Sequence, residues 1–259
     1  MGKRSWPDLA ALGRPALGTW SQIASEECVD MLGAAGLDFT IIDAEHGAFG
    51  IETAERLMRA CDANGLVPLV RIARPEPFLV GQALDAGAAA VVAPGVSSAQ
   101  MARDLVAASR FAPGGTRGAC PCVRAGAHFV RDWPAYAGRQ RVETGVIVLV
   151  ETRPGLEAVE EICATEGLLA LLIGPFDLSV SLGLAGDYLA AEVQHAIDRM
   201  IAAAQANGLP VIAPVFNPDL VEARRQQETW KARGATHLVV GTDKIIFADA
   251  VSRYVARLR

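Results

Sequence analysis

Lysine is scarce in this chain. The 259 residues contain only Lys3, Lys231 and Lys244. A Schiff-base aldolase needs a desolvated lysine, usually inside a barrel. Lys3 lies near the amino terminus, Lys231 falls on a late predicted helix, and only Lys244 follows a predicted strand. This scarcity argues against Schiff-base chemistry, so any carbonyl chemistry is expected to rely on a metal.

Long apolar runs and an excess of positive charge are also missing. No stretch of about 18 apolar residues is available to span a membrane, and the segment 1–18 has no apolar run long enough for a signal peptide. The formal net charge is −5 and no basic block occurs, which argues against nucleic-acid binding. We therefore expect a cytoplasmic protein with small-molecule partners, and neither nucleic acid nor membrane among them.

The five cysteines are scattered and odd in number. Cys120 and Cys122 are separated by one residue, which is too few for the usual zinc-binding pattern. A disulfide scheme is the alternative. We favour free thiols in a reducing compartment.

Apolar β-rich segments alternate with amphipathic segments along the chain. The predicted strands cover 16–20, 38–43, 67–72, 89–93, 145–151, 169–173, 210–215 and 237–241. The predicted helices cover 25–35, 51–64, 76–86, 97–110, 155–165, 188–206, 217–233 and 243–257. Eight βα units without a break in composition favour an α/β fold with one (β/α)₈ TIM barrel over 1–259. An open doubly wound sheet is the alternative, but no Gly-x-Gly-x-x-Gly follows the first strand and no phosphate loop occurs.

Glycines mark the ends of the predicted helices. Glycine is the usual residue in the left-handed position that follows a helix, and it follows six predicted helices, at Gly36, Gly65, Gly87, Gly167, Gly208 and Gly234. The segment 111–144, rich in Gly, Arg and aromatics, is an insertion between the fourth and fifth strands. Loops on the carboxyl side of a barrel often cover the active site, which makes this insertion a candidate cover.

Ionisable residues gather where the predicted strands end. The run Phe39-Thr40-Ile41-Ile42-Asp43-Ala44-Glu45-His46-Gly47 has the composition of a buried parallel strand that ends in two carboxylates and an imidazole. Ionisable residues also follow apolar runs at Arg71, Glu151 and Asp177. Barrels place their chemistry at the carboxyl ends of the strands. We therefore expect one shared site and an enzyme.

Glu151 and Asp177 are the candidate metal ligands. They end consecutive predicted strands, and neighbouring strands lie about 4.8 Å apart, so the two carboxylates can share one ion. A hard divalent ion such as Mg²⁺ or Mn²⁺ prefers oxygen ligands, keeps several waters and leaves positions for a substrate. The alternative is that each carboxylate caps the helix that follows it. Their joint occurrence at adjacent strand ends favours the metal.

Asp43, Glu45 and His46 form the second candidate group. Histidine is the side chain best suited to proton transfer near neutral pH, and one carboxylate could orient it while the other contacts a water on the metal. A strand-end turn with solvated charges is the alternative. Arg71 could stabilise an enolate, bind a carboxylate or neutralise Asp43 and Glu45. The other histidines are expected to be structural: His128, His195 and His237.

Six ordered motifs resemble one known family. They are Gly18-Thr19-Trp20, Ile42-Asp43-Ala44-Glu45-His46, Val70-Arg71, Pro113-Gly114-Gly115-Thr116-Arg117-Gly118, Val150-Glu151-Thr152-Arg153 and Ile173-Gly174-Pro175-Phe176-Asp177-Leu178-Ser179. They resemble the HpcH/HpaI aldolases, the metal-dependent class II pyruvate aldolases that include the 4-hydroxy-2-oxoheptanedioate and 2-dehydro-3-deoxyglucarate types. The resemblance spans nearly the whole chain and implies a (β/α)₈ barrel.

The resemblance assigns the metal and pyruvate contacts. Glu151 and Asp177 would hold a divalent cation, Mg²⁺, Mn²⁺ or Co²⁺, which binds pyruvate through its carboxylate and keto oxygens. Arg71 would hold the keto oxygen and stabilise the enolate. Gly174 and Pro175 would offer backbone to the pyruvate carboxylate.

The resemblance also assigns the proton chemistry and further substrate contacts. His46 with Asp43 would move the proton of the C4 hydroxyl, and Glu45 would hydrogen-bond a water on the metal. Trp20 and Phe176 would join the substrate site. In the family, hexamers form by exchange of the last helix, here 243–257, so a homo-oligomer is expected.

Two residues depart from the family pattern. Relatives usually carry glutamine two residues before the glutamate ligand, where this chain has Leu149. They usually carry a small residue just before the aspartate ligand, where this chain has Phe176. We expect a drier and more crowded pyruvate site that disfavours 2-oxo acids larger than pyruvate.

The expected activity is reversible cleavage of a 4-hydroxy-2-oxo acid to pyruvate and an aldehyde. The metal would act as a Lewis acid on the 2-keto group, so cleavage leaves a stabilised pyruvate enolate. Three alternatives remain open: a CoA-thioester lyase of the citrate lyase β-subunit branch, a 2-oxo acid decarboxylase that uses the same enolate, and a barrel that binds an organic acid without turnover. The sequence does not identify the aldehyde.

Overall fold

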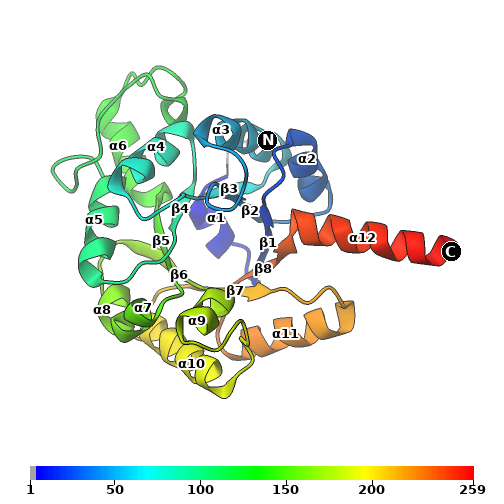
Figure 1. Ribbon diagram of the computed structural model, residues 1–259. Coiled ribbons are helices and arrows are strands. Elements are labelled where there is room, and N and C mark those ends of the chain that lie inside the picture. Colours follow the sequence, from blue (N-terminus) through cyan, green and yellow to red (C-terminus); the bar gives the residue numbers. More distant parts are fainter. Residues whose placement is uncertain (1–3) are drawn as a thin grey trace.

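The alternating apolar segments form a closed parallel barrel with helices on the outside (Figure 1). The computed structural model describes residues 4–259, and its strands pair in the order β1 to β8, with β8 returning to β1. The strands are β1 (Ala16–Ser21), β2 (Phe39–Asp43), β3 (Val67–Arg71), β4 (Ala90–Ala93), β5 (Gly145–Val150), β6 (Leu168–Ile173), β7 (Val211–Val215) and β8 (His237–Thr242). The predicted (β/α)₈ barrel is confirmed.

The helices follow the prediction less closely than the strands. They are α1 (Trp6–Ala10), α2 (Glu26–Ala34), α3 (Ile51–Asn64), α4 (Pro77–Ala86), α5 (Ala99–Ser109), α6 (Trp133–Glu143), α7 (Arg153–Glu157), α8 (Val159–Cys163), α9 (Pro175–Ser181), α10 (Ala191–Ala206), α11 (Leu220–Ala232) and α12 (Asp243–Leu258), with a 3₁₀ turn η1 (Arg124–Gly126). The sequence did not predict α1, α6 and α9, and the predicted helix 155–165 is divided into α7 and α8. Helix α9 is too short for an apolar period, but Pro175 suits its first position because a proline lacks the N–H that would be unpaired there.

The predicted glycines after helices adopt the conformation for which they were singled out. All six have positive φ, between 66° and 107°: Gly36, Gly65, Gly87, Gly167, Gly208 and Gly234. At Gly65 the backbone N–H donates to Cys61 O at the end of α3. A residue with a side chain rarely adopts this left-handed backbone conformation, so five of these glycines fix where a helix stops. The prediction is wrong for Gly167, because α8 already ends at Cys163 and Gly167 directly precedes β6.

Helix α1 closes the barrel where the strands begin. Trp6 stacks on His237, with ring centroids 4.8 Å apart and planes 10° apart, and Phe39 meets the same imidazole edge-on. Position 18 must be glycine, because an added Cβ would lie 2.5 Å from the Phe39 ring. Burial lowers the pKa of His237 to about 4, so this histidine packs as a neutral ring.

The strand register brings the chemical groups to the opposite end. Asp43 is paired with Arg71 across β2 and β3, and Val150 is paired with Ile173 across β5 and β6. Glu151 therefore follows one strand end beside the end of the next. Because all strands run in parallel, these groups meet at the carboxyl end of the barrel.

The insertion does not cover the active site, which corrects the expectation from the sequence. Segment 111–144 follows helix α5 and leads into β5, so it lies where strands begin rather than where they end. Its helix α6 contacts α1. Buried Arg117 anchors the segment through an ion pair with Asp85 and a contact with the Phe111 ring, 4.5 Å from its centroid.

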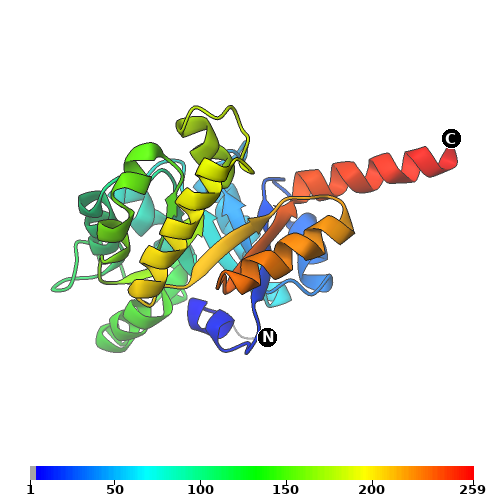
Figure 2. The same cartoon turned by 90° about the horizontal axis from the view of Figure 1, so that it is seen from below.

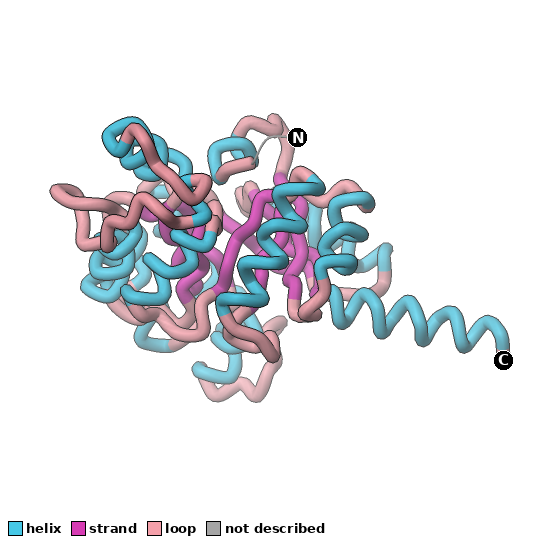
Figure 3. Tube along the Cα trace, turned by 90° about the horizontal axis from the view of Figure 1, so that it is seen from above, coloured by secondary structure: helices cyan, strands magenta, loops and turns pink. Residues whose placement is uncertain are grey.

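The last helix, α12, leaves the barrel and extends away from it (Figures 2 and 3). Its exposed apolar side chains are Ile245, Ile246, Phe247, Val251, Tyr254, Val255 and Leu258. Among residues 4–259, no helix has the length and hydropathy required to cross a bilayer. The five cysteines are free thiols, with Cys61 and Cys163 buried against the barrel.

Candidate active site

A cavity of about 340 Å³ opens at the carboxyl ends of the strands. The predicted site residues that line it are Trp20, His46, Arg71, Glu151, Gly174, Pro175, Phe176 and Asp177. Asp43 and Glu45 do not line the cavity but contact Arg71, which does. The structure therefore brings all of the predicted residues together: eight line the cavity, and Asp43 and Glu45 lie behind Arg71.

Arg71 and Asp43 form a buried pair beneath the cavity. Arg71 Nε donates to Asp43 Oδ1 at 2.8 Å and Nη2 donates to Oδ2 at 2.6 Å. Burial tends to raise the pKa of the Asp43 carboxyl, but the hydrogen bonds and charge of Arg71 outweigh it and hold that pKa below its ordinary value. The Trp20 ring covers the other side of the guanidinium, 4.3 Å from its centroid. Arg71 is thus fixed in position as a cation.

Glu45 is the second carboxylate beside Arg71. Its Oε2 lies 3.0 Å from Arg71 Nη1, yet this buried oxygen has no hydrogen-bond partner among the described residues. Burial raises the pKa of Glu45 above its ordinary value, although the charge of Arg71 opposes the shift. The Glu45 side chain is 24% exposed overall, although its Oε2 is buried against Arg71.

His46 is carried into the cavity by a tight turn. The backbone N–H groups of Glu45 and His46 donate to Asp43 Oδ1 at 3.1 and 3.2 Å, and Gly47 N donates to Asp43 O at 3.0 Å. Glycine is required at position 47, because an added Cβ would overlap Asp43 O. No hydrogen bond within residues 4–259 joins the Asp43 carboxylate to the His46 ring. Asp43 therefore fixes the turn that presents His46.

Glu151 is held by a neighbouring loop and does not cap a helix. Its Oε1 accepts from Gly95 N at 2.9 Å, whereas α7 is capped by Thr152, whose side chain accepts from Gly155 N. An added Cβ at Gly174 would lie 2.8 Å from Glu151 Oε2, so the glycine makes room for this carboxylate. Burial first, then repulsion by Asp177 and Glu45, raises the pKa of Glu151 to about 7.

Asp177 lies in the first turn of α9 and lines the cavity. The N-cap residue of this helix is Gly174, so Asp177 is not the cap that the alternative interpretation required. Both carboxylates line the same cavity, and repulsion by Asp177 contributes, after burial, to the raised pKa of Glu151. The capping explanation accounts for neither carboxylate.

The site fits a hard divalent cation. The carboxylates of Glu151 and Asp177 repel one another across the cavity, and the charge of Glu45 adds to the repulsion on Glu151. A cation would relieve this repulsion, and oxygen donors are those that Mg²⁺ and Mn²⁺ prefer. Within residues 4–259, no three His, Cys, Asp or Glu side chains gather around one point. The other coordination positions would therefore belong to water and substrate.

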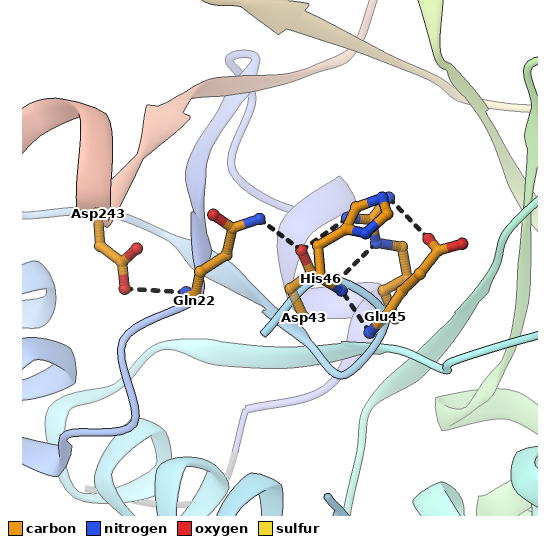
Figure 4. A network of polar contacts seen from close by, with 6 residues as sticks. Gln22, Asp43, Glu45, His46 and Asp243 are labelled. Atoms are coloured by element: carbon orange, nitrogen blue, oxygen red, sulfur yellow. Dashed lines mark hydrogen bonds and ion pairs between the residues drawn. The ribbon is translucent and has the colours of Figure 1, made fainter. Parts of the chain in front are cut away.

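The sequence did not point to two residues of this site, Gln22 and Asp243. Gln22 follows the end of β1, and its Nε2 donates to Asp43 Oδ2 at 2.7 Å. Asp243 follows the end of β8, and its Oδ2 accepts from Gln22 N and Ile23 N at 2.9 and 2.8 Å. Figure 4 shows Gln22 between the carboxylates of Asp43 and Asp243. Both follow strand ends, so the rule that selected Asp43 also covers them.

The two residues that depart from the family pattern occupy different parts of the cavity. Leu149 is buried at its floor, with Cδ1 3.0 Å from where a Cβ at Gly174 would stand. Phe176 is 54% exposed, and an added Cβ at Gly186 would lie 2.9 Å from its ring. Phe176 thus belongs to the rim.

Comparison with known proteins identifies the family. A family model described as HpcH/HpaI aldolase/citrate lyase matches residues 16–250. The chain belongs to this family. It is 34% identical to hydroxypyruvate/pyruvate aldolase of Roseovarius nubinhibens, over 96% of this chain and 94% of that relative. It is 32% identical to 5-keto-4-deoxy-D-glucarate aldolase of Klebsiella pneumoniae, over 92% and 90%.

The three-dimensional comparison agrees. A crystal structure of an HpcH/HpaI aldolase/citrate lyase family protein from Burkholderia cenocepacia superposes with a TM-score of 0.88 and 32% identity, covering 98% of each chain. The relatives are named as aldolases, which are carbon–carbon lyases. The predicted family and enzyme class are confirmed.

Proposed function

We propose that this HpcH/HpaI family member is a divalent-metal-dependent aldolase that reversibly cleaves a 4-hydroxy-2-oxo acid to pyruvate and an aldehyde. The observation that carries the proposal is the convergence of Glu151, Asp177 and Arg71 on one cavity. Two carboxylates without a capping role favour a cation, and the buried guanidinium beside them suits an enolate oxygen.

Glu151 and Asp177 would hold the cation, with Mg²⁺, Mn²⁺ or Co²⁺ as candidates. When bound, the ion supplies Lewis-acid polarisation of the 2-keto group. Glu45, whose side chain is 24% exposed, would accept a hydrogen bond from a water in the cavity. Gly174 and Pro175, beside Glu151, would contact the pyruvate carboxylate through their backbone atoms.

Arg71 would bind the keto oxygen and stabilise its negative charge. A guanidinium carries five N–H groups, and Asp43 takes one from Nε and one from Nη2. The remaining N–H groups are free to contact Glu45 and the substrate oxygen. Because Asp43 and Trp20 hold the guanidinium, little reorganisation is needed as charge develops.

His46 would remove the proton of the C4 hydroxyl. As the C4 oxygen becomes the aldehyde carbonyl, the C3–C4 bond breaks and its electron pair enters the pyruvate enolate. Protonation at C3 then gives pyruvate. Asp43 would contribute by fixing the turn that presents His46.

The test is exchange of the pyruvate methyl protons with D₂O, followed by ¹H NMR, because this reaction needs the enolate but no aldehyde. Exchange should stop when a chelator is added and return with Mg²⁺, Mn²⁺ or Co²⁺. Activity that survives the chelator, together with a borohydride-trapped pyruvate adduct on Lys244, would overturn the proposal in favour of a Schiff base.

We also propose that the protein is a homo-oligomer, with a hexamer expected from the family resemblance. Helix α12 extends from the barrel and exposes apolar side chains along its length, including Phe247 and Tyr254. Such a face is costly in water unless a partner covers it. Multi-angle light scattering of the full chain measures the assembly, and a monomer at micromolar concentration would contradict this proposal.

A further inference from the structure

The wall of the cavity between the metal-binding carboxylates and the solvent is apolar. It is formed by Phe176 on α9, Tyr188 in the loop before α10, Phe216 after β7 and Ile245 in the first turn of α12. Phe176 and Ile245 are 54% and 42% exposed, so they form the rim. These side chains come from four separate segments of the chain and face one opening.

The position of the Phe176 ring is set by the opposing loop. Gly186 has a φ of 89°, and an added Cβ there would lie 2.9 Å from Phe176 Cε2. The absence of a side chain at position 186 therefore leaves the space that the aromatic ring occupies. The Phe176 ring is thus packed in a defined position at the rim.

The cavity offers no free cation at this rim. Arg71 is the one arginine or lysine that lines it among residues 4–259. That guanidinium lies at the inner end, where it already faces Asp43 and Glu45. A second anionic group on the substrate would therefore find no unpaired arginine or lysine at the rim among residues 4–259, where the wall is apolar.

The geometry fixes which part of the substrate meets the apolar wall. The proposed chemistry places the 2-oxo acid against Glu151, Asp177 and Arg71. In the synthetic direction, the aldehyde carbon bonds to C3 of the enolate and its oxygen takes up a proton. The remainder of the aldehyde must then extend outward, past Phe176 and Tyr188.

We propose that the aldehyde partner carries an apolar chain or ring and no carboxylate. This inference rests on the proposed aldolase function and adds the substrate class. The apolar wall would contribute by removing hydrocarbon surface from water, and a carboxylate on the aldehyde would lose its hydration there without gaining a cationic partner.

The experiment compares two aldehydes of matched shape with pyruvate as the nucleophile. In 4-methylpentanal, an isopropyl group replaces the carboxylate of 4-oxobutanoate. We expect kcat/KM for 4-methylpentanal to exceed that for 4-oxobutanoate by at least about tenfold, the scale of one or two methyl groups in an apolar pocket. A preference for 4-oxobutanoate would overturn the inference.

A variant that adds a positive charge to the rim tests the same inference. Tyr188→Arg places a cation at the rim, so the ratio of the two kcat/KM values should shift toward 4-oxobutanoate by about tenfold. Phe129→Arg is the matched control, because Phe129 is an exposed aromatic in the insertion, away from the cavity. A Tyr188→Arg ratio equal to that of the control would show that the rim does not contact the aldehyde and would overturn the inference.

The readouts separate this inference from the proposed function. Exchange of the pyruvate methyl protons needs no aldehyde. If exchange occurs and the carboxylated aldehyde is preferred, the substrate class is wrong while the aldolase proposal stands. If the metal-loaded protein catalyses no exchange, both fall together.

Discussion

Gln22 Nε2 donates to Asp43 Oδ2 at 2.7 Å, whereas the turn contacts of this carboxylate are accepted by Oδ1. The Gln22 backbone N–H is in turn bound by Asp243, the first residue of α12. The loop after β1 therefore links the base of the projecting helix to the carboxylate that fixes Arg71 and the turn of His46. Figure 4 shows this chain of contacts.

Replacement of Gln22 by leucine should lower kcat for cleavage by about tenfold, the effect of losing a hydrogen bond to a charged group. The metal ligands remain, so the affinity for Mn²⁺ should change little. Gln100→Leu is the control, since Gln100 bonds an exposed carboxylate on α5. Equal kcat values for the two variants would show that Asp43 keeps its position without Gln22.

The His46→Ala variant should lose about 10²- to 10⁴-fold in kcat for cleavage, the usual contribution of a general acid or base. Calorimetric titration with Mn²⁺ should give near wild-type affinity, because His46 is not a proposed ligand. His128→Ala, in the insertion, serves as the matched histidine control. A His46→Ala enzyme with wild-type kcat would move the proton transfer to another group.

Gly174→Ala tests the packing of the metal site. An added Cβ would lie 2.7 Å from Glu151 Cβ and 2.8 Å from its Oε2, so the carboxylate must move. We expect Mn²⁺ affinity to fall by at least about tenfold, the scale seen when a ligand loses its support. Gly138→Ala in α6 has open space at its Cβ and should bind Mn²⁺ like the wild type. Unchanged affinity in Gly174→Ala would argue against Glu151 as a ligand.

Residues that belong to local patterns were predictable from the sequence, and residues brought together by barrel closure were not. Asp43, Arg71 and Glu151 each stand at the end of an apolar β-rich run, so their meeting point follows from parallel strand direction alone. The contact of Gln22 with Asp243 joins β1 to β8, across 221 positions of sequence. It depends on the register of the closing strand pair, which includes an irregularity between Gly18 and Trp20.

The side on which the insertion lies was also beyond the local pattern. A loop between two strands can precede or follow the intervening helix, and only the second case sends it to the end where strands begin. The composition of 111–144 is the same in both cases. Similarly, the sequence did not distinguish a Phe176 on the cavity floor from one on the rim, because its ring position depends on the distant Gly186.

Stability should fall with acidification through His237. Burial lowers its pKa from 6.5 to about 4, so between these values the unfolded chain binds a proton that the folded chain does not. The stabilisation is complete above pH 6.5 and is lost progressively toward pH 4, by at most about 3 kcal/mol. Urea unfolding at several pH values should show a flatter dependence for His237→Leu than for the exposed-site control His195→Leu. Parallel curves would contradict a buried neutral imidazole.

The choice of nucleophile is the last test, and the structure redirects the expectation from the sequence. Both Leu149 and Phe176 were expected to disfavour 2-oxo acids larger than pyruvate. Leu149 lies at the floor and packs against Gly174, at the inner end where the 2-oxo acid would bind, whereas Phe176 lies at the rim. Leu149→Ala should therefore raise kcat/KM for 2-oxobutanoate relative to pyruvate by about tenfold, the scale of one methylene in a pocket. Phe176→Ala should change that ratio much less. If Phe176→Ala gives the larger shift, its ring reaches the floor during turnover, and the original expectation holds.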